Sequence, residues 1–402
     1  MSRPLADHAL VSEGSSIQSL GRASMNIMID ALPFLGDGGI TSYVRGLVHA
    51  LLALDDADRY ELLFRTGSRA RRAAVQHLRR DPDLAAASFR CLPVPDGIVE
   101  RVWRLGRWAG SMVPRASAAD VFFATLLIAP QLDGGRVVPL VFDLIPLRFP
   151  QWYGADARRL ERRLIAVAPQ AAVWMAISEA TRSDLHECLG IPTSSIRVVH
   201  PGVDREFEMA PVSLGERARL ARHGIEGPYL LYVGGYGPHK NVETLLQAWS
   251  LVRAGRSRRC QLVLAGPGRW ASERITTVDP AEGVRFLGYV PREELALLYR
   301  GAELFVTASL DEGFGLPALE AMACGTPVVV SCAGALPEVV GDGGELVEPH
   351  DAEAIAATIT SLLEDEVARS ELAERGRRQA SRFRWSDAAR AARAVFAEAV
   401  ER

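Results

Sequence analysis

Runs of valine, isoleucine and leucine, separated by helix-length segments, recur along most of this 402-residue chain. Because these runs are continuous and do not alternate with polar residues, they indicate strands that are buried on both faces of a parallel sheet. The candidates in the first half are MNIMIDAL (25–32), VFFAT (121–125), VVPLVFDL (137–144), VWMAIS (173–178) and IRVVHPG (196–202). This alternation predicts a doubly wound α/β domain.

The second half repeats the pattern more regularly. Its strand candidates are YLLYVGG (229–235), QLVLAGPG (261–268), VRFLGYV (284–290), ELFVTAS (303–309), TPVVVS (326–331) and GELVEP (344–349). We therefore predict two Rossmann-like domains, at residues 23–205 and 206–384, that face a cleft in which ligands bind. A disordered extension is expected at residues 1–22, and a charged helix at residues 385–402 is left over after the second sheet.

Bulk properties exclude several classes of protein. The net charge of −3 does not suggest nucleic-acid binding, and the five cysteines form no C-x-x-C pair that would indicate a disulfide or zinc framework. No run of eighteen apolar residues exists to span a membrane. Residues 1–22 contain no apolar core of a signal peptide, so a cytoplasmic protein is expected.

One lysine, Lys240, stands against 45 arginines, and it lies in the glycine-rich segment YVGGYGPHKN (232–241). A strand, a glycine loop and a helix start together present free N–H groups and a positive dipole end to an anion. A lysine adds a compact charge that suits phosphate. The sequence favours a phosphate site here, although a solvated turn with an extended lysine is the alternative. Neither G-x-G-x-x-G nor the P-loop pattern is present.

A second segment, SLDEGFGLPALEAMACGTPVVVS (309–331), places Glu312 in a loop before a predicted helix. Pro317 is expected at the first helical position and Glu320 in the first turn. Two carboxylates that frame a row of loop amides suit a polyhydroxylated ligand that carries phosphate. The alternative is that Glu320 only complements the helix dipole.

The segment EGFGLPALE (312–320) resembles the E-x7-E motif of retaining GT-B glycosyltransferases of family 4. The flanking segments 285–309 and 320–349 and the lysine loop GGYGPHKN are also similar to that family. In the first half, VFDLIPLRFP (141–150) and residues 176–204 resemble its bacterial mannosyltransferase-like branch. The resemblance covers residues 25–395 and implies a GT-B fold whose terminal helix crosses back to the first domain.

The resemblance also implies roles for individual residues. Glu320 would bind the ribose hydroxyls of the nucleotide, Glu312 would bind the donor sugar, and Lys240 would neutralise the diphosphate leaving group. Backbone amides of residues 314–316 would hold the sugar and the diphosphate, and Gly38 and Gly39 would approach that diphosphate. The other donor-binding positions that it implies are Gly234, Gly235, Gly266, Tyr289, Val290, Gly313, Phe314, Gly315 and Leu316.

Two positions depart from the family pattern. The arginine that usually follows the strand is replaced by Gly235, and His239 is expected to substitute for it in part. The usual H-D-L reads Phe142-Asp143-Leu144, so the histidine expected near the donor sugar is missing. Asp143 is the remaining catalytic candidate of the first domain. It orients either the site or the acceptor, or it is only a strand-end turn carboxylate.

These features predict transfer of a hexose, mannose from GDP-mannose by resemblance, to a hydroxyl of a glycan or lipid-linked glycan in surface polysaccharide biosynthesis. No metal or cofactor is expected, since the D-x-D matches at 56–58 and 81–83 lie in polar loops. The alternatives are a UDP-sugar-dependent transferase, a sugar-nucleotide epimerase and a non-catalytic binding protein.

Arginine-rich segments at 69–80 and 101–115 suggest a further partner. The second segment interleaves its arginines with Trp103 and Trp108, and such basic, aromatic helices can lie on the anionic inner face of a membrane. The alternative is that both are solvated helix faces whose tryptophans pack in the core.

Overall fold

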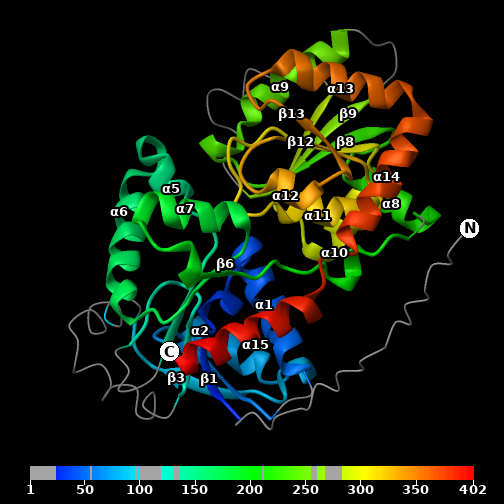
Figure 1. The fold of residues 1–402 in the computed structure, drawn as a ribbon. Helices are drawn as coiled ribbons and strands as arrows, with labels where there is room; N and C mark the ends of the chain where they lie inside the picture. The colour runs from blue at the N-terminus through cyan, green and yellow to red at the C-terminus, as the bar shows by residue number, and fades with distance from the viewer. Residues whose placement is uncertain are drawn as a thin grey trace, which may run out of the picture.

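The protein contains two parallel β-sheets, each covered by helices, that lie one above the other in Figure 1. The computed structural model describes residues 24–54, 57–95, 98, 119–130, 136–210, 212–254, 260–267 and 283–402. The predicted extension at residues 1–22 lies outside these residues. All pairs of neighbouring strands in both sheets run parallel, which confirms the predicted doubly wound α/β class.

The first sheet has seven strands in the order β3-β2-β1-β4-β5-β6-β7. Their bounds are β1 Asn26–Asp30, β2 Arg59–Arg65, β3 Ser88–Leu92, β4 Val121–Ala124, β5 Arg136–Val141, β6 Trp174–Ala176 and β7 Ile196–Val198. The α-helices of this half are α1 Gly39–Leu52, α2 Arg69–Leu78, α5 Ile145–Arg148, α6 Pro150–Val167 and α7 Glu179–Leu189. Its short 3₁₀-helices are η1 Leu32–Leu35, η2 Pro82–Leu84, η4 Ala168–Gln170, η5 Thr193–Ser195 and η6 Arg205–Phe207.

The second sheet has six strands in the order β10-β9-β8-β11-β12-β13. Their bounds are β8 Tyr229–Val233, β9 Gln261–Ala265, β10 Val284–Gly288, β11 Leu304–Thr307, β12 Val328–Ser331 and β13 Gly344–Val347. The helices of this half are α8 Leu214–Arg222, η7 Pro238–Lys240, α9 Val242–Ala254, α10 Arg292–Gly301, α11 Leu316–Ala323, α12 Leu336–Val340, α13 Ala352–Glu364 and α14 Glu366–Ala380.

The sequence pattern identified every described strand except β2 and β3, including the edge strands β7, β10 and β13. Every residue of β4, β11 and β12 is buried, as expected of strands with helices on both faces. The pattern did not identify β3, an edge strand of the first sheet, or β2, which lies between β3 and β1. Charged residues interrupt both sequences (RYELLFR and SFRCL): β3 is largely half-buried or exposed, whereas most of β2 is buried and its Arg65 pairs with the buried Asp30.

The last helix, α15 Trp385–Glu401, packs against α1, β4 and β5 of the first half (Figure 1). Gly46 of α1 leaves room for the Trp385 ring, because a Cβ at that glycine would collide with the indole. The two chain crossings between the halves also lie side by side, since the N–H of Val203 donates to the carbonyl of Phe383 at 3.1 Å. The indole N–H of Trp385 donates to Asp204 Oδ1 at 2.5 Å on the first of these crossings.

One local prediction was wrong. Helix α11 begins at Leu316, so Pro317 is its second residue and Glu320 its fifth, beyond the first turn. Gly315 adopts a positive φ of 99° and forms the N-cap, which moves the helix start one residue earlier than the proline suggested. Glu320 is therefore too far along the helix to act mainly on its dipole, whose effect is limited to the first turn.

Candidate active site

The lysine loop and the glutamate loop lie at the switch point of the second sheet. The lysine loop follows β8, and the segment that contains Glu312 follows β11. These two strands are neighbours at the place where the strand order changes direction. Because ligands in open α/β sheets bind beyond the carboxyl ends of the strands at that place, this is where a site is expected.

Lys240 and Glu312 form a close ion pair there. The lysine Nζ donates to both carboxylate oxygens, at 2.7 Å to Oε1 and 2.8 Å to Oε2. The Ser309 hydroxyl also donates to Glu312 Oε1 at 2.8 Å. Although burial would raise it, the pKa of Glu312 is lowered by the Lys240 charge and by these hydrogen bonds. The carboxylate is therefore ionised at neutral pH and faces the only lysine of the chain.

The lysine loop is fixed by its glycines and by Asn241. Gly266 has a φ of 150° and approaches Gly234 so closely that a Cβ would collide with its carbonyl oxygen. Asn241 adopts a left-handed conformation with a φ of 51°. Its side-chain amide donates to the carbonyls of Ala308 at 2.9 Å and Pro349 at 2.6 Å. Asn241 thereby ties the end of the lysine loop to the end of β11.

Glu320 is held apart from this pair by a different set of partners. Its side chain is buried, and it accepts hydrogen bonds from the Tyr299 hydroxyl at 2.9 Å and from Arg292 at 3.3 Å. Burial raises the pKa of Glu320 to about 7, against the lowering effects of Arg292 and Tyr299. Its protonation therefore changes near neutral pH.

Two glycine-capped helix N-termini meet between the halves of the molecule. Gly38, with a φ of 93°, is the N-cap of α1, and Gly315 is the N-cap of α11. A Cβ at Gly39 would lie 3.6 Å from Leu316 Cδ1, so the two helix starts are in contact. The N–H groups of residues 39–41 at the start of α1 and of Leu316 at the start of α11 have no acceptor within their helices, and the Ala318 N–H donates to Gly315, so the remaining donors of this junction suit an anion.

Asp143 of the first half faces the glutamate loop. A Cβ at Gly313 would collide with the Phe142 carbonyl and would lie 2.9 Å from the Asp143 Cβ. Burial raises the pKa of Asp143, with a smaller lowering by the Ile145 N–H and Lys240 and a raising by Glu312. Its Oδ1 accepts from the Ile145 N–H at 3.1 Å, as expected of a carboxylate in a turn at the end of a strand. The same side chain also lies beside the glutamate loop, so the two predictions for Asp143 do not exclude each other.

Phe142, which stands where the family has histidine, does not replace it chemically. Its ring packs edge-to-face on Tyr43 of α1, with centroids 5.5 Å apart and planes at 89°. The position is therefore used for packing between α1 and the end of β5.

His239 is a neutral ring. Burial, followed by the Lys240 charge, lowers the pKa of His239 to about 4. Its Nδ1 is hydrogen-bonded to the hydroxyl of Tyr153 of α6 in the first half. A neutral imidazole supplies hydrogen bonding but no positive charge. The expectation that His239 partly substitutes for the missing arginine at Gly235 is therefore not supported as far as charge is concerned.

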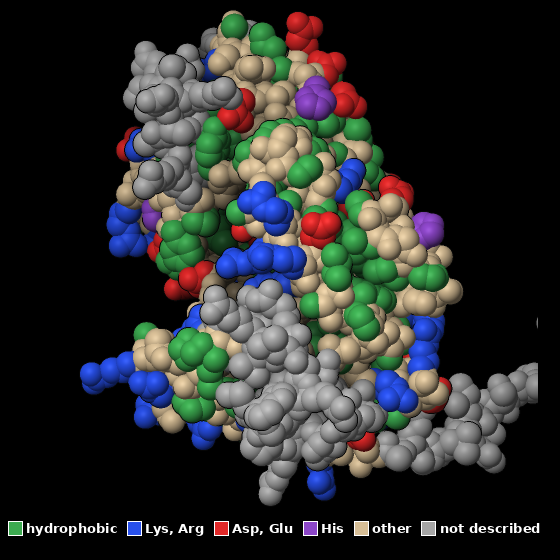
Figure 2. Space-filling model, turned by 90° about the vertical axis from the view of Figure 1, so that its left-hand side faces the viewer, with side chains coloured by type: hydrophobic (Ala, Val, Ile, Leu, Met, Phe, Trp, Pro, Cys, Tyr) green, Lys and Arg blue, Asp and Glu red, His purple; other side chains and the backbone are tan. Residues whose placement is uncertain are grey.

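A contact across the cleft was missed by the sequence analysis. Arg148 of α5 donates to Asp311 Oδ2 at 2.6 Å and pairs with Asp184 Oδ1 at 3.4 Å. Burial raises the pKa of Asp311 to about 6 even with Arg148 beside it. Arg148 lies inside the quoted segment VFDLIPLRFP, but nothing in residue type or spacing identifies its partner 163 residues away. Figure 2 shows Lys and Arg side chains gathered at mid-height on this face, where the two halves meet.

The donor-binding residues Tyr289, Val290 and Phe314, which the resemblance implies, differ in exposure. Tyr289 is 59% exposed, whereas Val290 is buried in the core. Phe314 is buried as well, and it packs edge-to-face on Phe383 with centroids 5.6 Å apart. The side chains of Val290 and Phe314 therefore support the loops, and only backbone groups of these two residues are available to a ligand.

The arginine-rich segment at 101–115 and Asp56 lie outside the described residues. The other arginine-rich segment forms α2, of which Val75 is the buried residue. Contact with a membrane stays a prediction. Within the described part of the chain, no helix is long and apolar enough to cross a bilayer. The same residues contain no cluster of three or more potential metal ligands of the His, Cys, Asp and Glu types.

Comparison with known proteins identifies the family. Residues 37–207 match the model of Glycosyltransferase Family 4, and residues 220–379 match that of glycosyl transferases group 1. The chain is 35% identical over 263 residues to the O-antigen chain mannosyltransferase B of Escherichia coli, covering 63% of this chain and 68% of that protein. It is 30% identical over 263 residues to the serotype-specific mannosyltransferase WbdA of Escherichia coli, covering 63% of this chain but only 32% of that protein.

Solved structures agree on the fold. The crystal structure of Anabaena HepE in complex with UDP and glucose matches with a TM-score of 0.69 at 18% identity, covering 93% of this chain and 99% of that chain. Two facing Rossmann-like domains with this arrangement define a GT-B protein. The chain belongs to glycosyltransferase family 4 and is a glycosyltransferase.

Proposed function

We propose that this protein transfers mannose from a nucleotide-diphosphate sugar, GDP-mannose being our choice of donor, to a hydroxyl of a surface polysaccharide or a lipid-linked precursor. The observation that carries the proposal is the Lys240–Glu312 pair at the switch point of the second sheet. Support for mannose comes from the two Escherichia coli relatives that are named mannosyltransferases.

In this proposal the donor diphosphate lies where the glycine-capped starts of α1 and α11 meet. Lys240 neutralises the developing charge on the leaving diphosphate. Glu312 accepts hydrogen bonds from sugar hydroxyls, and the amides after Gly313 hold the sugar and its phosphates. Glu320 accepts hydrogen bonds from the ribose hydroxyls, and its carboxylate form accepts them most strongly.

The transfer then needs no nucleophile from the protein. The bond between the anomeric carbon and the phosphate oxygen breaks, while the acceptor hydroxyl forms a bond to that carbon on the same face. The proton of the acceptor moves to the departing phosphate. Because the new bond forms on the face that the phosphate leaves, the anomeric configuration is retained. Preorganised charges that stabilise such a transition state contribute about 3–4 kcal/mol for each donor group. Asp143 orients the acceptor or the sugar from the opposite wall.

The experiment is an assay of nucleotide release with GDP-mannose and with UDP-sugars, each with and without oligosaccharide or polyprenyl-linked acceptors. Acceptor-dependent release of GDP with formation of an α-mannoside supports the proposal. Release of UDP alone would assign a UDP-sugar transferase, for which the HepE complex with UDP and glucose is the precedent in the same fold. Conversion of the donor sugar without acceptor would assign an epimerase, and binding without turnover would contradict the enzymatic proposal.

A further inference from the structure

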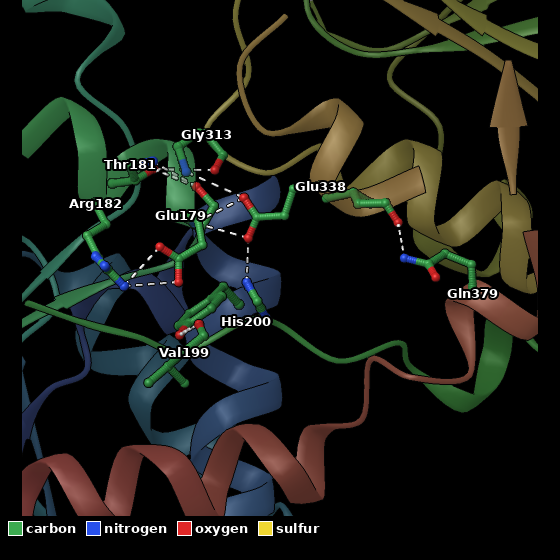
Figure 3. Close-up of polar contacts among 12 residues, drawn as sticks. Glu179, Thr181, Arg182, Val199, His200, Gly313, Glu338 and Gln379 are labelled. Carbon is green, nitrogen blue, oxygen red and sulfur yellow. Dashed lines mark hydrogen bonds and ion pairs between the residues drawn. The ribbon is translucent and has the colours of Figure 1, made fainter. Parts of the chain in front are cut away.

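A glutamate of the second half is bound at the start of a helix of the first half (Figure 3). Glu338 lies on α12, and its two carboxylate oxygens each accept from the backbone N–H of Glu179, both at 3.0 Å. The N–H of Ala180 donates to Oε2 at 3.4 Å. These are the first two N–H groups of α7, and 159 residues separate Glu338 from Glu179 in the sequence.

This contact completes the N-terminal cap of α7. The first four N–H groups of a helix have no partner within the helix. The Ser178 hydroxyl accepts from the third of them, at Thr181, at 3.0 Å. Glu338 supplies the acceptor for the first two, and its negative charge complements the positive end of the helix dipole. A carboxylate from the other domain thus accepts the hydrogen bonds of the two N–H groups for which residues next to α7 provide no acceptor.

His200 binds the same carboxylate. Its Nε2 lies 2.6 Å from Glu338 Oε1, and its ring packs on Phe314 with centroids 5.9 Å apart. His200 belongs to the chain crossing between the domains, and Phe314 belongs to the EGFGLPALE segment. Burial would raise the pKa of Glu338, but the hydrogen bonds from His200 and from the start of α7 hold it below its usual range. Glu338 is therefore ionised in this contact.

The contact between α12 and the start of α7 also touches the glutamate loop, from two sides. The Ala335 N–H, just before α12, donates to the carbonyl of Glu312 at 3.0 Å. On the α7 side, the Thr181 hydroxyl lies 3.1 Å from the Phe142 carbonyl and 3.4 Å from the Gly313 carbonyl. The start of α7 therefore touches the strand end that precedes Asp143 and the loop that contains Glu312.

We propose that Glu338 is a positioning residue: bound at the start of α7, it holds the two domains at the separation at which Asp143 faces the Lys240–Glu312 pair. The inference rests on the proposed transferase site. Glu338 touches neither donor nor acceptor in this proposal. It acts on the distance between the two domains, the second of which contains the lysine loop and the glutamate loop.

The test combines hydrogen exchange with kinetics in the full-length protein. Glu338→Ala and the isosteric Glu338→Gln remove the charge at the start of α7. Glu345→Ala is the matched control, because Glu345 follows on β13 and makes only a long pair with Arg375 at 3.8 Å among its described contacts. All three variants are first compared with wild type by thermal unfolding, and the assays are made at least 15 °C below the lowest midpoint.

We expect amide exchange in residues 179–180 to accelerate about tenfold or more in Glu338→Ala, and kcat to fall about tenfold. The dissociation constant for GDP, measured by calorimetry, should change less than twofold, because Lys240, Glu320 and most of the other proposed donor-binding groups belong to the second domain and only the start of α1 belongs to the first. Glu338→Gln keeps an acceptor and should lie between Glu338→Ala and wild type in both measurements. Glu345→Ala should match wild type.

A variant with a lower unfolding midpoint but unchanged kcat would show that the contact is only structural and would overturn the proposal. Unchanged exchange at residues 179–180 would overturn it too, as would an equal kcat loss in Glu345→Ala. Absence of turnover in wild type contradicts the transferase proposal instead, and the exchange measurement then decides by itself whether Glu338 holds the domains together.

Discussion

The two sheets share a strand order over six positions but carry different chemistry at their carboxyl ends. In the second sheet, the loops after β8 and β11 provide the Lys240–Glu312 pair and the glycine-capped start of α11. In the first sheet, the corresponding edge provides the glycine-capped start of α1, an aromatic pair and two carboxylates, Asp143 and Asp30, of which Asp30 at the end of β1 is paired with Arg65. A repeated fold thus does not repeat a function, since function depends on the residues placed at the switch point.

This difference indicates which of the two domains supplies most of the charged groups at the proposed site. In the function that we propose, the second domain supplies most of the groups that bind the nucleotide-diphosphate sugar. The first domain contributes a helix start, the uncharged Tyr153–His239 contact and several interdomain contacts, among them those from Arg148 and to Glu338. Mutations of the second domain should therefore affect donor binding and the chemical step, and those of the first should mainly affect the acceptor and the closure of the cleft.

The largest expected effect is at Lys240. Lys240→Met should lower kcat about 10²- to 10³-fold, because it removes the cation that faces the leaving group. It should also destabilise the fold by about 3 kcal/mol, because the buried Glu312 charge loses its partner. Denaturant unfolding measures the second effect. The double variant Lys240→Met/Glu312→Gln should recover most of the stability and none of the activity, which separates the two causes.

Lys240→Arg tests whether the site requires the shape of the lysine side chain as well as its charge. The charge remains, but the planar guanidinium does not replace a slim ammonium in a loop bounded by Gly234, Gly235 and Gly237. We expect kcat to fall at least tenfold with little change in unfolding midpoint. Activity equal to wild type would show that charge is all the site requires.

The second effect concerns Glu320 and pH. The pKa of Glu320 is raised to about 7, so its ionised fraction increases between pH 6 and pH 8. Because the ionised carboxylate accepts ribose hydrogen bonds more strongly than the protonated acid does, the affinity for GDP should rise over this range with a midpoint near pH 7. Calorimetry at several pH values checks this. Glu320→Gln should bind GDP about 10- to 100-fold more weakly and should lose the pH dependence.

The raised pKa of Glu320 also predicts the direction in which the free energy of unfolding changes with pH. A carboxyl group whose pKa is higher in the folded state than in the unfolded state binds protons more tightly when folded. The contribution of Glu320 to the free energy of unfolding should therefore be complete below about pH 4.5 and be lost as the pH rises through about 7. Subtracting the pH profile of Glu320→Gln from that of wild type isolates this contribution. A difference that grows with pH over this range would contradict the assignment.

The third prediction tests the role of the first domain through Asp143. Asp143→Asn should lower kcat about tenfold, corresponding to ~1.4 kcal/mol of barrier, while the dissociation constant for GDP stays within twofold. Asp156→Asn on the exposed face of α6 is the matched control and should change neither quantity. If Asp143→Asn weakens GDP binding as much as it lowers kcat, the proposed division of labour between the walls is wrong.

The smallest effect is at Tyr153. Tyr153→Phe removes one hydrogen bond to His239, worth about 1 kcal/mol, so kcat should fall by at most about fivefold. Because the pKa of His239 is lowered to about 4, this loss should be the same at pH 6 and pH 8. A loss that appears only at the lower pH would show that the ring becomes charged.

Much of the second half could be predicted from residues that are close in sequence. Continuous apolar runs identified its strands, and EGFGLPALE and GGYGPHKN identified its loops. Local signals were less exact where one residue decides a boundary, as at Gly315, whose positive φ starts α11 before Pro317. Strands β2 and β3 were not predicted because charged residues interrupt their apolar pattern, although β2 is an interior strand and most of it is buried.

The sequence by itself determined the class of fold, the two loops and the single lysine among arginines, because each depends on neighbouring residues. Only the tertiary structure decided what these groups face. Lys240 meets Glu312 because β8 lies next to β11, Arg148 meets Asp311 across the cleft, and Glu338 binds the start of α7. Strand order and domain contact follow from packing over distances of 72 to 163 residues, which no local pattern encodes.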